Sequence, residues 1–181
     1  MPLTVIIEGA NNVGKTTICR MLEQWLQHIN CNYTYFHDSD LYDCVVQGQK
    51  TFNLEDLVKE RKEVYKELRE DYDLILLDRS FMSTILYNLN VQTQTYIDEY
   101  IQRELLNLKP TPKDRLMVFI MVRDSEDALS NEYSDLAHSL QIMYHVPSHV
   151  YLTYEDLNRT FDVFKNEIYD ELDNMKLVGD M

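Results

Sequence analysis

Apolar and polar residues follow two periods along the chain, one typical of strands and one typical of helices. Short runs rich in β-branched, aliphatic or aromatic residues, most of them followed by glycine or a charged residue, predict buried strands. Stretches in which apolar residues recur every three or four positions predict amphipathic helices. The predicted strands are 4–8, 33–37, 74–77, 116–122 and 149–153, and the predicted helices are 15–30, 54–71, 80–88, 93–108, 132–145 and 154–174.

Strands and helices alternate along most of the chain, which predicts an α/β fold with a five-stranded parallel sheet and helices on both faces. In open sheets of this kind, ligands bind at the edge where the carboxyl ends of the strands meet. No internal repeat or low-complexity linker interrupts the pattern. We therefore expect residues 1–181 to form a single domain.

Composition limits the partners that we expect. Of the 181 residues, 45% are hydrophobic and 27% are charged, which is typical of a globular protein. A net charge of −14 repels a phosphate backbone, which favours a small-molecule substrate over a nucleic acid. A few arginines in a cleft can still hold a small anion, so a polynucleotide acceptor is disfavoured but stays open.

The cysteines indicate a compartment. Cys19, Cys31 and Cys44 form no C-x-x-C pair, which argues against a disulfide framework or a zinc site and for a reducing environment. No apolar run reaches the roughly 18 residues that span a bilayer, and no basic leader precedes the first predicted strand. We expect a cytoplasmic protein with no membrane partner.

A phosphate-binding loop follows the first predicted strand. Residues 9–16 fit G-x-x-x-x-G-K-S/T, the Walker A pattern, and lie between a predicted strand and a predicted helix. Lys15 is expected to reach the β- and γ-phosphates of a nucleoside triphosphate, and the Thr16 hydroxyl to hold Mg²⁺. The motif predicts a three-layer P-loop NTPase fold with ATP and Mg²⁺ as cofactors. The expected ATP-binding residues are Gly9, Asn11, Asn12, Val13, Gly14, Lys15, Thr16 and Thr17.

An acid and an arginine end the third predicted strand. Asp78 follows the apolar run 74–77, and an acid at this place in a P-loop enzyme binds Mg²⁺ or its coordinated water. Arg79, the next residue, can neutralise an acceptor phosphate in the same cleft. The pair predicts phosphoryl transfer, with Lys15, Asp78 and Arg79 as catalytic residues and with Thr16 and Asp78 as metal ligands.

The two motifs together resemble a known family. "IEGANNVGKTT" followed by "DRSFMSTILYN" resembles thymidylate kinase, a nucleoside monophosphate kinase, in which Asp78, Arg79, Ser83 and Tyr87 match the second motif. The deoxynucleoside kinases are near relatives, but they carry E-R-S where this chain has D-R-S. The resemblance implies ATP-dependent phosphorylation of a deoxynucleoside monophosphate, dTMP or a modified pyrimidine nucleotide, to the diphosphate. Since family members are usually dimers, it also makes a homodimer an option.

The resemblance implies roles on the acceptor side. Arg79 would contact the phosphate of the monophosphate, and Thr84 would lie near the base. Tyr87 would lie against the deoxyribose and exclude a 2′-hydroxyl. Arg61 is the only plausible counterpart of a substrate-binding arginine in the family, although it stands about one helical turn too close to Asp78. Alternatively, it is a solvated residue of the charged run 59–62. Ser83 completes the substrate-binding residues of this motif.

Two departures from the family concern the acceptor. Asn11 replaces the aspartate of the family's P-loop, which removes a carboxylate near the sugar and the acceptor phosphate. Asp38 and Asp40 follow the second predicted strand, where the family carries an arginine-containing motif or a proline. Either carboxylate could reach the substrate, and Asp38 could serve as general base toward a hydroxyl acceptor. Alternatively, both belong to a helix cap or turn.

A third departure is the lid over the γ-phosphate. The family's arginine-rich lid is shortened here to a stretch near 123–132, and it contributes no arginine of its own. Arg123 before it and Arg159 at the start of the last helix are candidates for the lid or adenine side. The shortened lid leaves two other functions open. One is a kinase for a hydroxyl of a nucleoside, modified base or polynucleotide, and the other is a non-catalytic nucleotide-binding module.

Overall fold

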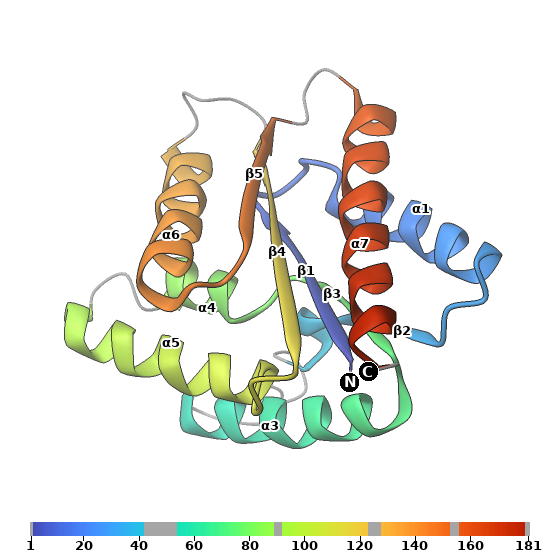
Figure 1. Cartoon of the computed structure of the whole chain (residues 1–181). Coiled ribbons are helices and arrows are strands. Elements are labelled where there is room, and N and C mark those ends of the chain that lie inside the picture. Colours follow the sequence, from blue (N-terminus) through green and yellow to red (C-terminus); the bar gives the residue numbers. More distant parts are fainter. Residues whose placement is uncertain (1, 42–53, 89–91, 123–127, 153–155, 180–181) are drawn as a thin grey trace.

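The computed structural model describes residues 2–41, 54–88, 92–122, 128–152 and 156–179 (Figure 1). Strands and helices alternate along it much as the sequence pattern predicts. The elements are β1 (Leu3–Gly9), α1 (Lys15–His28), β2 (Tyr33–His37), α3 (Leu54–Asp71), β3 (Leu74–Asp78), α4 (Phe81–Asn88), α5 (Gln94–Leu108), β4 (Arg115–Val122), α6 (Ala128–Tyr144), β5 (Ser148–Leu152) and α7 (Leu157–Gly179).

The strands form one parallel sheet in the order β2-β3-β1-β4-β5. Strand β1 lies in the middle, with β3 on one side and β4 on the other, so the chain changes direction across the sheet beside β1. The register pairs Ile7 with Asp78 and His37 with Asp78 across neighbouring strands. The carboxyl ends of β1, β2 and β3 therefore meet at one edge, where ligands bind in sheets of this topology.

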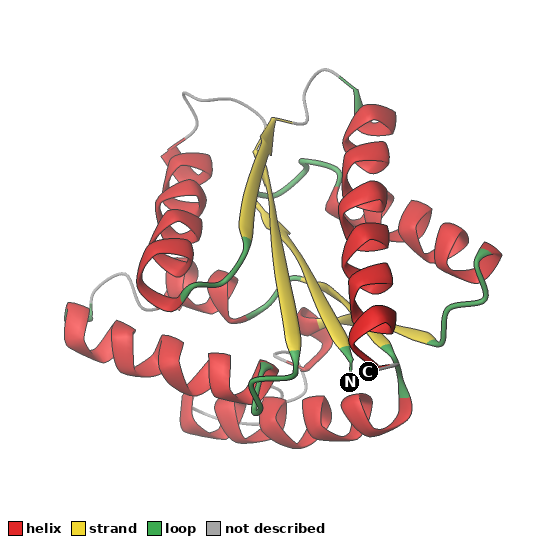
Figure 2. Ribbon diagram, viewed as in Figure 1, coloured by secondary structure: helices red, strands yellow, loops and turns green. Residues whose placement is uncertain are grey.

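Helices cover both faces of the sheet, which gives three layers (Figures 1 and 2). Alternate side chains of each strand enter two separate cores, because successive residues of a strand point to opposite faces. Val5 and Ile7 pack with residues of α1 and α7, whereas Ile6 packs with residues of α3, α4, α5 and α6. The five-stranded α/β P-loop architecture expected from the sequence is confirmed.

Helix boundaries correct the sequence prediction in two places. Helix α6 begins at Ala128 and not at 132, because Leu129 packs against both cores and Ser130 is buried, so this stretch continues the helical stripe. Helix α7 begins at Leu157 and runs on to Gly179, past the predicted end at 174. The predicted start of that helix, 154, lies outside the described residues.

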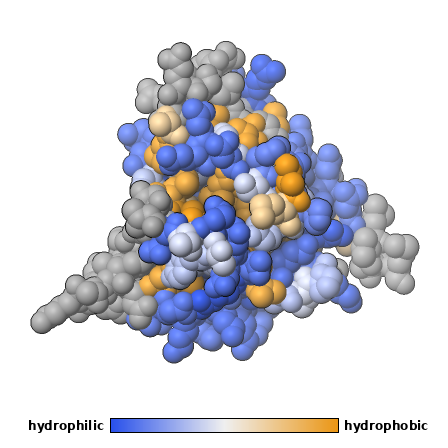
Figure 3. Space-filling model, turned by 90° about the vertical axis from the view of Figure 1, so that its left-hand side faces the viewer, coloured by the Kyte–Doolittle hydropathy of each residue, from blue (hydrophilic) through white to orange (hydrophobic). Residues whose placement is uncertain are grey.

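No helix in the described ranges is both long enough and apolar enough to cross a membrane. The face that carries α5 and α6 is largely hydrophilic, with hydrophobic residues gathered in a hollow near its middle (Figure 3). Several large apolar side chains on these helices are exposed, among them Leu106, Ile142 and Met143.

Candidate active site

The loop between β1 and α1 has the backbone that its glycines permit. Gly9 has φ 139° and Gly14, the N-cap of α1, has φ 93°. A Cβ at Gly9 would collide with the Met121 carbonyl of β4, and one at Gly14 would lie 2.9 Å from Leu157 Cδ2. Glycine is therefore required at both positions, and the loop leads directly into the N-terminus of α1. A helix N-terminus with free backbone N–H groups is a favourable site for phosphate.

Lys15 lies across this loop. Its Nζ donates hydrogen bonds to the carbonyl oxygens of Gly9, at 2.9 Å, and Ala10, at 2.5 Å. Burial, followed by the nearby Arg79 guanidinium, lowers the pKa of Lys15 from 10.5 to about 8. An anion in the loop would offset both effects, so Lys15 is placed to receive a phosphate oxygen.

The end of β3 meets α1 at Asp78 and Thr16. Thr16 Oγ1 donates a hydrogen bond to Asp78 Oδ2 at 2.8 Å, and the Tyr35 hydroxyl donates to the same oxygen at 3.0 Å. Asp78 Oδ1 is buried and has no hydrogen-bond partner among the described residues. A hydroxyl and a carboxylate oxygen with free lone pairs fit Mg²⁺, which takes few protein ligands and completes its shell with phosphate and water. Within the described ranges, no cluster of three or more His, Cys, Asp or Glu residues could hold a metal.

Two residues at this edge were missed by the sequence analysis. Besides Tyr35, His37 comes within 3.7 Å of Asp78, measured from Nε2 to Oδ2. The other ring nitrogen of His37 is 2.5 Å from Ser39 Oγ. The signal was available in principle, because a parallel pairing of β2 with β3 in this register puts Tyr35 and His37 on the side of Asp78.

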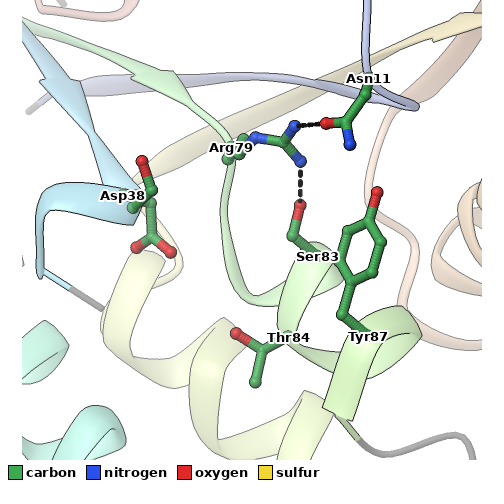
Figure 4. A pocket seen from close by; sticks show the side chains of 7 residues that line it. Asn11, Asp38, Arg79, Ser83, Thr84 and Tyr87 are labelled. Atoms are coloured by element: carbon green, nitrogen blue, oxygen red, sulfur yellow. Dashed lines mark hydrogen bonds between the residues drawn. The ribbon is translucent and has the colours of Figure 1, made fainter. Parts of the chain in front are cut away.

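Arg79 has an unusual backbone and a fixed side chain. Its φ is 74°, a left-handed conformation that is costly for a residue with a Cβ and that is enriched at functional sites. Its guanidinium donates to Ser83 Oγ at 3.1 Å and to Asn11 Oδ1 at 2.5 Å (Figure 4). The position that departs from the family's P-loop thus holds Arg79 through a neutral amide oxygen.

Glu8 holds Arg79 indirectly, through the hydrogen bonds that it accepts from Ser83. Glu8 was assigned no role by the sequence analysis. Its buried carboxylate accepts hydrogen bonds from the backbone N–H and hydroxyl of both Ser80 and Ser83, at 2.6 to 3.3 Å. These bonds cap the start of α4, which lacks intrahelical acceptors. Burial raises the pKa of Glu8 above its ordinary 4.5.

Two cavities meet at Arg79. One, of about 310 Å³, is bounded by residues of the P-loop, of the segment that follows β2, and of α4, and Figure 4 shows Asp38 and Tyr87 on opposite sides of it. The other, of about 520 Å³, follows the P-loop. Among the residues that the structure describes, only Asn11 and Arg79 line both. The smaller cavity is lined by Asn11, Asp38, Ser39, Arg79, Ser83, Thr84 and Tyr87, and the larger by Asn11, Asn12, Gly14, Lys15, Thr16, Thr17, His37, Asp78 and Arg79.

Arg61 is fully buried beneath the smaller cavity, which we call the acceptor cavity. Its Nε and one terminal nitrogen form a bidentate pair with Asp38 at 2.9 and 2.5 Å. The remaining N–H groups reach Glu104 at 2.9 Å, the Tyr100 hydroxyl at 2.7 Å and Thr84 Oγ1 at 3.0 Å. These five contacts match the five donors of a guanidinium. Direct binding of a substrate by Arg61 stays a prediction, and it would require Arg61 to give up one of these partners.

The other predicted residues lie farther from the two cavities. The Asp40 side chain is 79% exposed and lies 3.6 Å from His37, and it lines neither cavity. Arg159 is exposed in the first turn of α7. Arg123 lies outside the described residues. Val13 is buried in the P-loop and packs in the core beside α1.

The loop, the sheet order and the Thr16–Asp78 pair define a P-loop α/β protein. Searches add a more specific likeness, although no family model matches the chain. A protein named "Putative thymidylate kinase" from Acidianus bottle-shaped virus (isolate Italy/Pozzuoli) is 29% identical over 144 residues, which is 78% of this chain and 83% of the relative. The crystal structure of thymidylate kinase from Ehrlichia chaffeensis superimposes with a TM-score of 0.56 at 18% identity, covering 83% of this chain and 93% of that one. The chain has a thymidylate kinase-like fold, as its two motifs imply.

Proposed function

We propose that this protein is an ATP-dependent nucleoside monophosphate kinase, which transfers the γ-phosphoryl group of ATP to a deoxynucleoside monophosphate. The observation that carries this proposal is the position of Arg79 between two cavities, both of which are lined by its side chain and by Asn11. A guanidinium in that place can neutralise both the incoming phosphate and the group transferred to it. The names of the viral and Ehrlichia proteins support the same chemistry.

The donor side needs only residues of the P-loop and β3. The loop N–H groups and Lys15 would bind the triphosphate, and Thr16 and Asp78 would hold Mg²⁺, which supplies charge neutralisation when bound. An acceptor phosphate is already ionised at neutral pH, so the reaction needs no general base. Positioning and charge neutralisation provide most of the rate in phosphoryl transfer.

The acceptor side follows from the resemblance. Tyr87, which is 46% exposed, would lie against the deoxyribose, and Thr84 near the base, with Arg79 and Ser83 at the phosphate. The family makes dTMP or a modified pyrimidine nucleotide the acceptor. We propose that residues 1–181 form one domain. Its lid is much shortened, because only residues 123–127 separate β4 from α6. Arg123 or Arg159 would be the cation on the lid or adenine side of ATP. We also propose a cytoplasmic location, which the absence of a C-x-x-C pair among the three cysteines supports.

A second candidate is a kinase for a hydroxyl group, because the Asp38 carboxylate lines the acceptor cavity. As a general base, Asp38 would have to take a proton on an oxygen that already accepts from Arg61. Protonation of Asp38 would weaken its buried ion pair with Arg61, so this candidate function is energetically less favourable than the first.

The test is product identification after incubation with ATP and Mg²⁺. Acceptors would be the deoxynucleoside and ribonucleoside monophosphates, free nucleosides and a short DNA. We expect a deoxynucleoside diphosphate by mass, absent with Lys15→Ala and unchanged with the exposed Arg103→Ala. A phosphorylated product from a nucleoside or from DNA, with none from any monophosphate, would favour the second candidate. ATP binding without any product would leave a nucleotide-binding module.

A further inference from the structure

The acceptor cavity is lined by the carboxylate of Asp38 and not by Arg61, the arginine that the resemblance implies for substrate binding. Arg61 is 0% exposed, and its donors are directed at side chains of this chain. Asp38, by contrast, lines the cavity. The group that a ligand meets at this wall is therefore a hydrogen-bond acceptor with negative charge.

Asp38 has capacity left for a ligand. Its Oδ1 accepts from Arg61 Nε and from the Tyr65 hydroxyl at 3.0 Å, whereas Oδ2 accepts from Arg61 alone among the described contacts. A carboxylate has about four lone-pair sites, so one on Oδ2 remains. Because the bidentate pair and Tyr65 fix the carboxylate, that site has a defined direction and costs little ordering on binding.

The position of Asp38 in the acceptor cavity indicates which part of the acceptor nucleotide lies next to it. The phosphate belongs beside Arg79, where the cavity joins the P-loop cavity. The nucleoside then extends between Asp38 and Tyr87 toward Thr84, which lies at the far end from Arg79 in Figure 4. Thr84 Oγ1 and Asp38 Oδ2 both accept from the same nitrogen of Arg61, so the two side chains lie on one wall.

We propose that Asp38 selects a nucleotide whose base carries an amino group at C4 of a pyrimidine or at C6 of a purine, as cytosine and adenine do. An aspartate accepts from such an amino group, and the 4-amino group of cytosine is a good partner for it. A 4-oxo base would instead place its carbonyl oxygen against the carboxylate. The ring N–H of thymine lies between two carbonyl oxygens, so approaching it brings the same repulsion. This inference rests on the proposed function, but it replaces dTMP, which has no amino group, with an amino-bearing nucleotide as the acceptor.

Equilibrium binding tests the inference without requiring turnover. The pairs 5-methyl-dCMP and dTMP, and dAMP and dIMP, each exchange an amino for an oxo group. We expect the amino member to bind roughly tenfold or more tightly, since the oxo member leaves a buried acceptor unpaired. Equal affinities within a pair, or tighter binding of the oxo member, would overturn the inference. A loss of affinity seen only with 3′-deoxy analogues would also overturn the inference, because Asp38 would then bind the sugar hydroxyl and not the base.

The variant Asp38→Asn sharpens the test, because its amide can donate to an oxo group. Arg61 keeps Glu104 as a charged partner in this variant, so a buried charge is not left alone. We expect the preference within each pair to disappear or reverse. Glu60→Gln, an exposed carboxylate-to-amide change beside Arg61, should keep it. If Asp38→Asn does not fold, as thermal unfolding would reveal, the comparison of nucleotides on the wild-type protein decides alone.

The two proposals fail in different ways. Binding and turnover of monophosphates without an amino preference would contradict only the selection by Asp38. Absence of binding by every monophosphate would contradict the proposed function, and with it the selection.

Discussion

Ser83 Oγ donates a hydrogen bond to Glu8 Oε2 at 3.0 Å, although 75 positions separate the two residues in the sequence. The same hydroxyl accepts from Arg79, so the carboxylate at the end of β1 fixes the residue that joins the two cavities. Glu8 thus acts on the acceptor side through Ser83 and touches neither cavity itself.

The stability of the protein should depend on pH through Glu8. Burial raises the pKa of this group in the folded state, whereas the unfolded chain titrates near 4.5. Between the two values the folded state binds a proton that the unfolded state does not, so stability falls as pH rises through the folded pKa. Chemical denaturation of wild type and Glu8→Gln should show the wild type gaining relative stability as pH is lowered toward 4.5. A difference independent of pH would contradict this.

Removing the Arg79 side chain should separate stability from activity. Arg79→Gly and Arg79→Ala both lose the guanidinium, but only alanine keeps a Cβ at φ 74°. We expect the glycine variant to be more stable than the alanine variant by about 1 kcal/mol in denaturant unfolding. Both should lose acceptor-dependent turnover. An alanine variant as stable as the glycine variant would show that the backbone at 79 is not strained.

Asp78 should make nucleotide binding depend on Mg²⁺. Its unpartnered Oδ1 is the oxygen that a cation would use, and an amide replaces it poorly. Titration of a non-hydrolysable ATP analogue should show that Mg²⁺ strengthens binding to wild type and far less to Asp78→Asn. Asp73→Asn, an exposed change next to the other end of β3, is the matched control and should behave as wild type. An equal Mg²⁺ effect in all three proteins would place the cation elsewhere.

Removing Arg61 from its buried ion pairs with Asp38 and Glu104 should lower the stability of the protein strongly. Arg61→Met leaves Asp38 and Glu104 buried without their cation, a loss of about 3–5 kcal/mol. Arg103→Met breaks a bidentate pair with Glu55 whose side chains are 46% and 60% exposed, and should cost about 1 kcal/mol or less. Urea unfolding midpoints compare the two. Similar losses would mean that the buried network does not behave as an ion-paired unit.

The sequence predicts the fold well because its signals are local. The β-branched runs and amphipathic stripes fix each element to within a few residues, and the P-loop motif fixes the connection from β1 to α1. The location of Lys15, Thr16, Asp78 and Arg79 around one cavity was predictable for the same reason, since each residue belongs to a motif.

The rest of the site depends on contacts between distant segments. Glu8 looks like an ordinary residue at a strand end until β3 and α4 bring Ser80 and Ser83 to it. Arg61 lies in a run of exposed charges, 59–62, and only the packing of α3 against α5 buries it. Side-chain partners across a fold leave no periodic trace in one sequence, so neither network could be predicted.

The most direct test of the account is the rate of ADP formation at saturating ATP and Mg²⁺ as the concentration of deoxynucleoside monophosphate is raised. For the wild type we predict a hyperbolic, acceptor-dependent rate. Arg79→Ala should lower kcat/KM for the acceptor by roughly a hundredfold or more, a larger effect than on the affinity for ATP. Unchanged acceptor kinetics in Arg79→Ala, or ADP formation that does not respond to the acceptor, would contradict the placement of Arg79 between donor and acceptor.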